Sequence, residues 1–146
     1  MFEIRDISEL KLFEQKHTIK RAEYTEFIKH LKLCKPKYKR LFFKGPTISE
    51  WDKWVNDGIE EYYLLYTEEK PVARCSIEKY SDTSWEVGDV KTAREYRNKG
   101  FSKEIVSFAT QKILEQKKIA TCSTLPDNLA MLNVINSLGY QKTEII

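Results

Sequence analysis

A short basic stretch with one glycine carries the residues best suited to bind an anion. Residues 97–103 (RNKGFSK) lie where an alternating apolar segment gives way to a helical pattern. The first-turn amides of a helix have no intrahelical acceptors, and the helix dipole places partial positive charge there. Gly100 leaves the backbone bare, while Arg97, Lys99 and Lys103 add positive charge. By spacing alone, the stretch fits a phosphate-binding loop or a structural strand-to-helix turn.

Other motif classes are absent from the sequence. Neither the G-x-x-x-x-G-K-[ST] spacing of a Walker loop nor the G-x-G-x-x-G fingerprint of a dinucleotide fold occurs. Cys34, Cys75 and Cys122 are spaced widely and irregularly, unlike the paired ligands of a zinc site. We therefore predict ordinary core or surface thiols and no metal.

Length and composition predict one domain, residues 1–146. An apolar fraction of 41% is globular, and no apolar run approaches the roughly 18 residues of a membrane helix. The N-terminus lacks a secretory-signal pattern and three cysteines cannot all pair, so we expect a cytoplasmic location and no membrane partner. A net charge of +3 does not favour nucleic acid. The one basic run, residues 32–40, is interpreted as a solvated loop.

The N-terminal part of the chain is predicted to be mostly helical. After a strand at residues 2–5, one or two helices should cover residues 8–33, because apolar side chains there recur roughly on one helical face. Those side chains are Leu10, Phe13, Ile19, Tyr24, Phe27, Ile28 and Leu31. A short helix should follow, with Thr47 or Ser49 as its N-cap and Gly58 at its end.

The rest of the chain alternates strands and helices. Residues 62–66, 71–80 and 85–92 are rich in β-forming residues and separated by turn-like segments, which predicts an antiparallel meander. A helix at about 101–117 and a buried strand at 119–125 should follow. This crossover makes the strands at 85–92 and 119–125 parallel, so the fold class is α/β (α+β) with a mixed sheet.

The last elements are a helix and a strand. Pro126-Asp127-Asn128 should begin the helix, with Asp127 accepting from first-turn amides, and Gly139 should end it. The final strand should lie within residues 140–146.

Two segments together resemble motifs of the GCN5-related N-acetyltransferase (GNAT) superfamily. Residues 97–102 are similar to its R/Q-x-x-G-x-G/A motif, with Ser102 at the last position. Asn128, followed eleven residues later by Gly139-Tyr140, is similar to its N…LGF segment. The resemblance covers about residues 62–140 and implies a mixed, splayed β-sheet flanked by helices, the acyl-CoA N-acyltransferase fold.

The resemblance also implies that acetyl-CoA binds where the strands at 85–92 and 119–125 separate. Parted strands leave amides and carbonyls unpaired, and the two amide groups of pantetheine can pair with them. A bulge near Gly88 would help to open the gap. The expected contacts are the backbone of Val90 and Thr92, the pyrophosphate-binding residues Arg97, Asn98, Lys99, Gly100, Phe101, Ser102 and Lys103, the side chain of Asn128, and Asn133, which could equally be structural.

Acetyl transfer to an amine requires a neutral nitrogen, so a base is useful. Glu86 occupies the position that resembles the general base of some family members, and by period two it shares a face with Gly88 and Val90. The alternative is a surface glutamate without a catalytic role. Glu78, on the neighbouring strand, is a second candidate. A free backbone N–H near Val90 would stabilise the oxyanion.

The position of the usual acid departs from the family pattern. Many members place a tyrosine seven residues after the motif asparagine to protonate the leaving thiolate, but here that residue is Ile135. Tyr140, Tyr80 and Cys122 are weak substitutes. Two interpretations stay open: an acetyl-CoA-dependent N-acetyltransferase acting by direct attack in a ternary complex, and a catalytically silent acyl-CoA-binding domain.

The acceptor would be a small-molecule or peptide amine bound by the N-terminal helices and the loop at residues 80–84. Family members usually continue past the LGF segment with two strands, whereas only one fits comfortably in residues 141–146. The edge that this leaves leads us to expect a homodimer.

Overall fold

Seven strands form one mixed sheet in the computed structural model, which describes residues 1–143. Their order across the sheet is β2-β3-β4-β5-β6-β1-β7. The strands are β1 Phe2–Ile4, β2 Thr18–Arg21, β3 Glu60–Thr67, β4 Lys70–Glu78, β5 Ser84–Thr92, β6 Ile119–Cys122 and β7 Gln141–Lys142. β5 and β6 are parallel, and the other neighbouring pairs are antiparallel. The predicted fold class and the β3-β4-β5 meander are confirmed.

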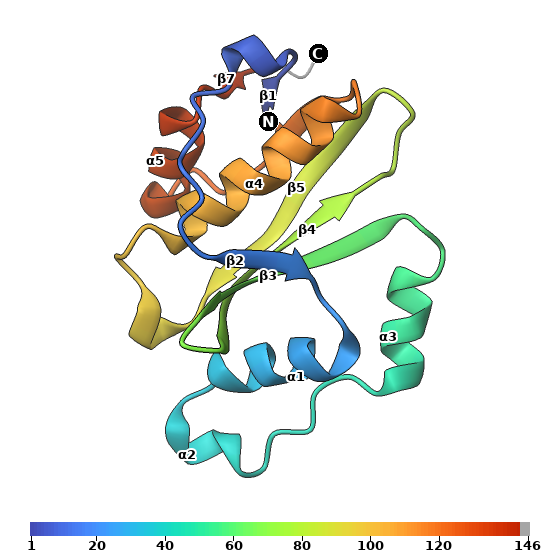
Figure 1. Ribbon diagram of the computed structural model, residues 1–146, viewed down its shortest axis with the longest axis vertical. Helices are drawn as coiled ribbons and strands as arrows, with labels where there is room; N and C mark the ends of the chain where they lie inside the picture. Colours follow the sequence, from blue (N-terminus) through green and yellow to red (C-terminus); the bar gives the residue numbers. More distant parts are fainter. Residues whose placement is uncertain (144–146) are drawn as a thin grey trace.

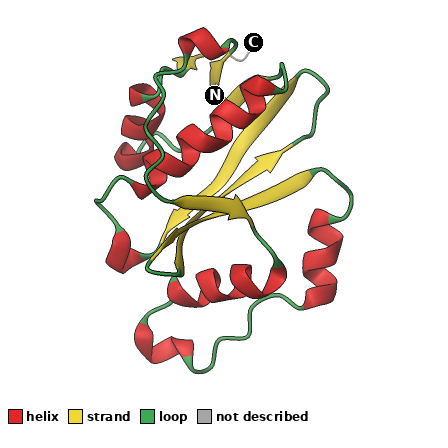
Figure 2. Ribbon diagram, in the orientation of Figure 1, coloured by secondary structure: helices red, strands yellow, loops and turns green. Residues whose placement is uncertain are grey.

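Helices cover both faces of this sheet, and Figure 1 shows α4 above the middle strands with α1 and α3 below them. The helices are α1 Tyr24–Leu33, α2 Lys37–Arg40, α3 Ile48–Val55, α4 Phe101–Glu115 and α5 Leu129–Ser137, and single 3-10 turns lie at Ile7–Glu9 and Arg94–Tyr96. The main core lies between the sheet and α4 and α5. A smaller core around Phe27, Trp51 and Leu64 lies under α1 and α3, so the molecule has three layers (Figure 2).

β5 is paired on its β6 side along only half of its length. The parallel register joins Ser84–Val87 to Ile119–Cys122, and within the described chain it stops there. On the β4 side the register shifts, so that Asp89 and Val90 both lie opposite Cys75. Asp89 has a left-handed φ of 45°, which accords with a bulge in β5. The predicted gap and the bulge beside Gly88 are therefore present.

The helical prediction for residues 8–33 is wrong in its first half. After the 3-10 turn, residues 10–17 form no regular element, and β2 then pairs antiparallel with β3. Ile19 is buried between the exposed Thr18 and Lys20, which is the alternation of a strand. Leu10, Phe13 and Ile19 do belong to one core, but their spacing only imitates a helical face.

Two predicted helix caps and one predicted loop are confirmed or corrected. Thr47 caps α3 in a capping box with Glu50. Asn128, and not Asp127, caps α5: its side chain accepts from the Met131 amide at 3.2 Å. The basic run predicted as a loop contains α2, and Arg40 bonds Glu95 at 2.8 Å.

β1 lies between β6 and β7, so the first and the last strand of the described chain are neighbours in the sheet (Figure 1). The final strand is confirmed at Gln141–Lys142, whereas residues 144–146 of the prediction lie outside the described residues. Among residues 1–143, no helix has the length and apolar character needed to cross a bilayer. The homodimer stays a prediction.

Candidate active site

A cavity of about 600 Å³ is lined by three segments that are separated in sequence. They are the end of β5, the loop and first turn of α4, and the beginning of α5. The lining residues are Val90, Lys91, Thr92, Tyr96, Arg97, Asn98, Gly100, Phe101, Ser102, Lys103, Asn128, Ala130, Met131, Asn133 and Val134. The structure thus brings together every predicted cofactor residue except Lys99, whose Nζ lies 5.9 Å from the centroid of the Tyr96 ring.

The loop before α4 presents a row of uncommitted backbone donors to this cavity. Asn98 and Gly100 have left-handed φ values of 65° and 83°, which turn the chain tightly before the helix begins at Phe101. Within the described chain, no amide from residues 98–103 donates to a protein acceptor, whereas the Glu104 amide donates to the Gly100 carbonyl at 3.0 Å. Such a cluster of free amides at a helix N-terminus suits an anion.

Side chains fix this loop to the end of β5. The Arg97 Nε donates to the Thr92 carbonyl at 3.1 Å, and the Thr92 and Ser102 hydroxyls are 2.6 Å apart. The two terminal guanidinium nitrogens of Arg97 make no such bond in the described chain. Lys91 and Lys103 also line the cavity. The cavity is therefore lined by several cations as well as by the free amides.

Two predicted contacts already have protein partners. The Thr92 backbone is predicted to pair with pantetheine, and its carbonyl accepts from Arg97. The Asn128 side-chain oxygen caps α5, which leaves its amide NH₂ as the group able to donate. Both contacts stay predictions, and fewer atoms of Thr92 and Asn128 are free to bind a ligand.

Sequence reasoning missed five lining residues: Lys91, Tyr96, Ala130, Met131 and Val134. The signal for the last three was present, because Val134 follows Ala130 by four residues and Met131 by three, which places all three near one face of the helix. Lys91 had no such signal, since its place depends on the bulge in β5.

The two candidate carboxylates lie next to one another on a different part of the sheet. Glu78 and Glu86 are direct cross-strand partners, and neither lines the cavity. Burial, followed by the neighbouring Glu86, raises the pKa of Glu78 to about 7. The predicted face is corrected: Val90 packs against the main core with Val87, because the bulge interrupts the alternation, whereas Glu86 and Gly88 face away from α4.

None of the substitutes considered for the missing tyrosine is well suited to donate a proton. Ile135 is fully buried in the main core. The buried Tyr140 hydroxyl lies 2.7 Å from the Thr110 hydroxyl, and burial raises the pKa of Tyr140. The Tyr80 hydroxyl donates to Glu60, which raises the pKa of Tyr80 to about 12. Burial also raises the pKa of Cys122 to about 12.

An ion pair holds the bulge that opens the gap. Arg74 on β4 donates to both carboxylate oxygens of Asp89, at 3.0 and 3.1 Å, and its side chain is only 14% exposed. We expect Arg74→Ala to lower the free energy of unfolding by roughly 1–2 kcal/mol, because an ion pair held by two hydrogen bonds is lost. Amide hydrogen exchange at residues 88–92 should become about fivefold faster. Urea unfolding and hydrogen exchange measure this. Arg5→Ala, which removes an exposed pair with Glu3, should cost under about 0.5 kcal/mol; equal losses would contradict the role of Arg74.

A family model matches most of the chain. The Acetyltransferase (GNAT) family model covers residues 24–140. A search of curated proteins found no match.

Solved structures share the fold at low sequence identity. A putative GNAT acetyltransferase from Novosphingobium aromaticivorans DSM 12444 has a TM-score of 0.66 and 15% identity, with 97% of this chain covered. The chain spans only 59% of that protein. An aminoglycoside acetyltransferase from an uncultured soil metagenomic sample, in complex with trehalose, has a TM-score of 0.70 and 16% identity, over 88% of this chain and 91% of that one.

A third solved structure contains a coenzyme A derivative. AAC(6')-Iy in complex with the bisubstrate analog CoA-S-monomethyl-acetylneamine has a TM-score of 0.66 and 13% identity, over 90% of this chain and 95% of that one. At such identities the likeness shows the fold.

Proposed function

Because the chain belongs to the acetyltransferase (GNAT) family, we propose that it transfers the acetyl group of acetyl-CoA to a primary amine of a small molecule, by direct attack in a ternary complex. The observation that carries the proposal is the cavity in which the free amides of residues 98–103 meet the unpaired half of β5. Acetyl-CoA can use both features, an anion site for its pyrophosphate and an extended polar edge for its pantetheine amides.

The lining residues fit the two parts of acetyl-CoA. The amides of residues 98–103, with Arg97 and Lys103, would hold the pyrophosphate. The free edge of β5 near Val90 and the NH₂ of Asn128 would pair with the pantetheine amides, and Met131 and Val134 would pack against its apolar atoms. When bound, the thioester supplies the activated acetyl group.

The acceptor side of the sheet is acidic. Glu60, Glu78 and Glu86 follow one another in cross-strand register on β3, β4 and β5, and Glu86 is in turn opposite Thr121. Such a row favours a cationic acceptor over a neutral or anionic one. The named activity of the aminoglycoside acetyltransferase with this fold supports an amine-bearing small molecule.

One observation favours a second candidate, a catalytically silent acyl-CoA-binding domain. Ile135 lies fully buried where many family members carry the tyrosine acid, and Tyr140, Tyr80 and Cys122 are poor donors. An assay of thiol release decides between the two candidates. Acetyl-CoA is supplied with sisomicin, neamine, spermidine or a short lysine peptide, and thiol released from any one supports transfer. Binding of acetyl-CoA without release from any acceptor supports the silent domain.

Arg97→Ala tests the anion site itself. We expect acetyl-CoA binding, measured by calorimetry, to weaken roughly tenfold, because one charge-assisted contact and the link to Thr92 are lost. Arg94→Ala is the matched control, since Arg94 is exposed in the adjacent 3-10 turn and does not line the cavity. An equal effect of both changes would point to general charge attraction and not to this site.

A further inference from the structure

The backbone creates room for a close pair of carboxyl groups between β4 and β5. Glu78 and Glu86 are in direct register, and Ser76 donates its hydroxyl to Glu78 Oε1 at 3.3 Å. A Cβ atom added at Gly88 would lie only 2.7 Å from the same Glu78 oxygen. Gly88 has no left-handed φ, so its missing side chain, and not its backbone conformation, is what the Glu78 carboxyl requires.

The carboxyl pair lies at the point where β5 and β6 begin to separate. Glu86 pairs with Thr121, and the next register pair, Val87 with Cys122, is the last before the gap. Val87 and Cys122 are buried in the main core on the α4 side. Glu86 therefore projects to the opposite face, away from the free amides and cations of the loop before α4. An amine and a thioester could thus approach the apex of the gap from opposite faces.

Among residues 1–143, no cation forms an ion pair with Glu78 or Glu86. Glu60 from β3 lies opposite Glu78, and Tyr62 and Tyr80 add only hydroxyls, both bonded to Glu60. β6 contributes the uncharged Thr121.

The two cations of β4 near the pair have acidic partners elsewhere. Arg74 is engaged by Asp89, and Lys79 is engaged by Glu61. When no cation is paired with two neighbouring carboxyl groups, the ionisation of both is unfavourable because the two negative charges repel. The raised pKa of Glu78, near 7, follows from its burial and from Glu86.

We propose that Glu78 and Glu86 share one proton and that Glu78 is the group that deprotonates the acceptor amine. This inference rests on the proposed acetyl transfer. In the step, Glu78 carboxylate takes a proton from R–NH₃⁺ to give R–NH₂ and the neutral carboxylic acid. The amine nitrogen then forms a bond to the acetyl carbon, the C–S bond breaks, and the second nitrogen proton goes to the departing thiolate. The Glu78 proton returns to solvent, so the sum is amide, thiol and H⁺.

The first experiment needs no acceptor. The pH titration of protein labelled with ¹³C at the glutamate carboxyl carbons is followed by NMR. We expect one resonance with a midpoint near pH 7, absent in Glu78→Gln and shifted to lower pH in Glu86→Gln, because the neighbouring negative charge is gone. Titration of every glutamate at ordinary pH values would overturn the shared proton.

The second experiment measures kcat/KM for thiol release against pH, with the acceptor that the panel identifies. Glu78→Gln should lower kcat/KM at pH 7 about 100-fold. It should also remove the acid limb of the pH profile, which is the fall of kcat/KM as Glu78 becomes protonated. Gly88→Ala keeps both carboxyls but displaces that of Glu78, so we expect a loss of about tenfold with the acid limb moved to lower pH. Glu69→Gln, in the exposed turn after β3, should change neither.

The outcomes separate this inference from the proposed function. Normal rates and an unmoved acid limb in Glu78→Gln and Gly88→Ala would overturn the role of the pair while acetyl transfer stands. Absence of thiol release from every acceptor would overturn both the transfer and the role of the pair in it. The NMR midpoint would then still decide whether the two carboxyls share a proton.

Discussion

Gly100→Asp should weaken acetyl-CoA binding roughly 1,000-fold without unfolding the protein. Gly100 has a φ of 83°, and among the described residues a Cβ added there meets only the Phe13 ring, at 3.8 Å, so an aspartate side chain has room beside the free amides that line the cavity. At about 5 Å and an effective dielectric constant near 20, one repulsive charge pair is worth about 3 kcal/mol. The blocked amides contribute further, and calorimetry measures the total.

Two other glycine variants separate charge from backbone strain. Gly58→Asp introduces the same charge at a φ of 75°, with nothing within 4 Å, and Gly58 does not line the cavity. It should leave acetyl-CoA affinity unchanged while costing a similar backbone penalty. Gly100→Ala adds bulk and strain only, so a loss of a fewfold is expected. A loss in Gly100→Ala as large as in Gly100→Asp would mean that electrostatics is not the main effect.

The features that the sequence predicts well are local. The loop at residues 97–103 depends on a glycine at a left-handed position and on first-turn amides, both of which are properties of a few adjacent residues. The same holds for the capping box at Thr47. The α4 helix and the meander follow from strong periodicity over many residues, so their bounds agree within a few positions.

The features that the sequence hides depend on distant partners. The apolar residues at 10–19 fit a helix, but Lys16 and His17 bond to Glu104, 88 and 87 residues away, and β2 needs β3 as its partner. β1 enters between β6 and β7 by tertiary pairing alone. The Glu78–Glu86 pair likewise depends on the cross-strand register, and the bulge then places Val90 on the opposite face. Nothing local to Glu78 indicates that its neighbour is another carboxyl.

Glu104→Ala should destabilise the protein by about 3 kcal/mol and also weaken acetyl-CoA binding. The Glu104 carboxyl is 3% exposed. Its Oε2 accepts from the Lys16 and His17 amides at 3.0 and 2.8 Å, and its Oε1 contacts His17 Nδ1 at 2.9 Å. Alanine leaves two backbone amides without their acceptor and His17 Nδ1 without its partner, and it removes a negative charge from the first turn of α4. Urea unfolding measures the loss.

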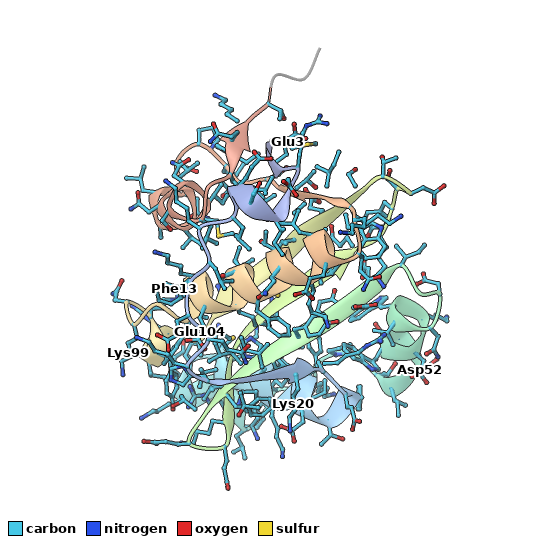
Figure 3. The ribbon with its side chains drawn as sticks, turned by 45° about the horizontal axis from the view of Figure 1, so that its top comes forward. Glu3, Phe13, Lys20, Asp52, Lys99 and Glu104 are labelled. Carbon is cyan, nitrogen blue, oxygen red and sulfur yellow. The ribbon has the colours of Figure 1, made fainter. Side chains whose placement is uncertain are left out.

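The effect on binding follows from what the Glu104 bonds hold in place. They fix the segment that carries Phe13 beside α4, and Figure 3 shows Phe13 and Glu104 at the start of this helix with Lys99 in the loop beyond. Phe13 lies against Gly100, and the Lys103 Nζ lies 4.8 Å from its ring centroid. Release of this segment would therefore loosen the wall of the anion site.

Glu104→Gln is the informative companion to this change, because it alters the charge and keeps the bonds. A glutamine oxygen can accept from both backbone amides, and its NH₂ can donate to the Nδ1 of a His17 ring protonated on Nε2. We expect a loss of about 1 kcal/mol, while Glu115→Ala, at the exposed end of the same helix, should cost under about 0.5 kcal/mol. If Glu104→Gln and Glu104→Ala lowered the free energy of unfolding equally, the negative charge would hold residues 10–17 against α4, and the three bonds would not.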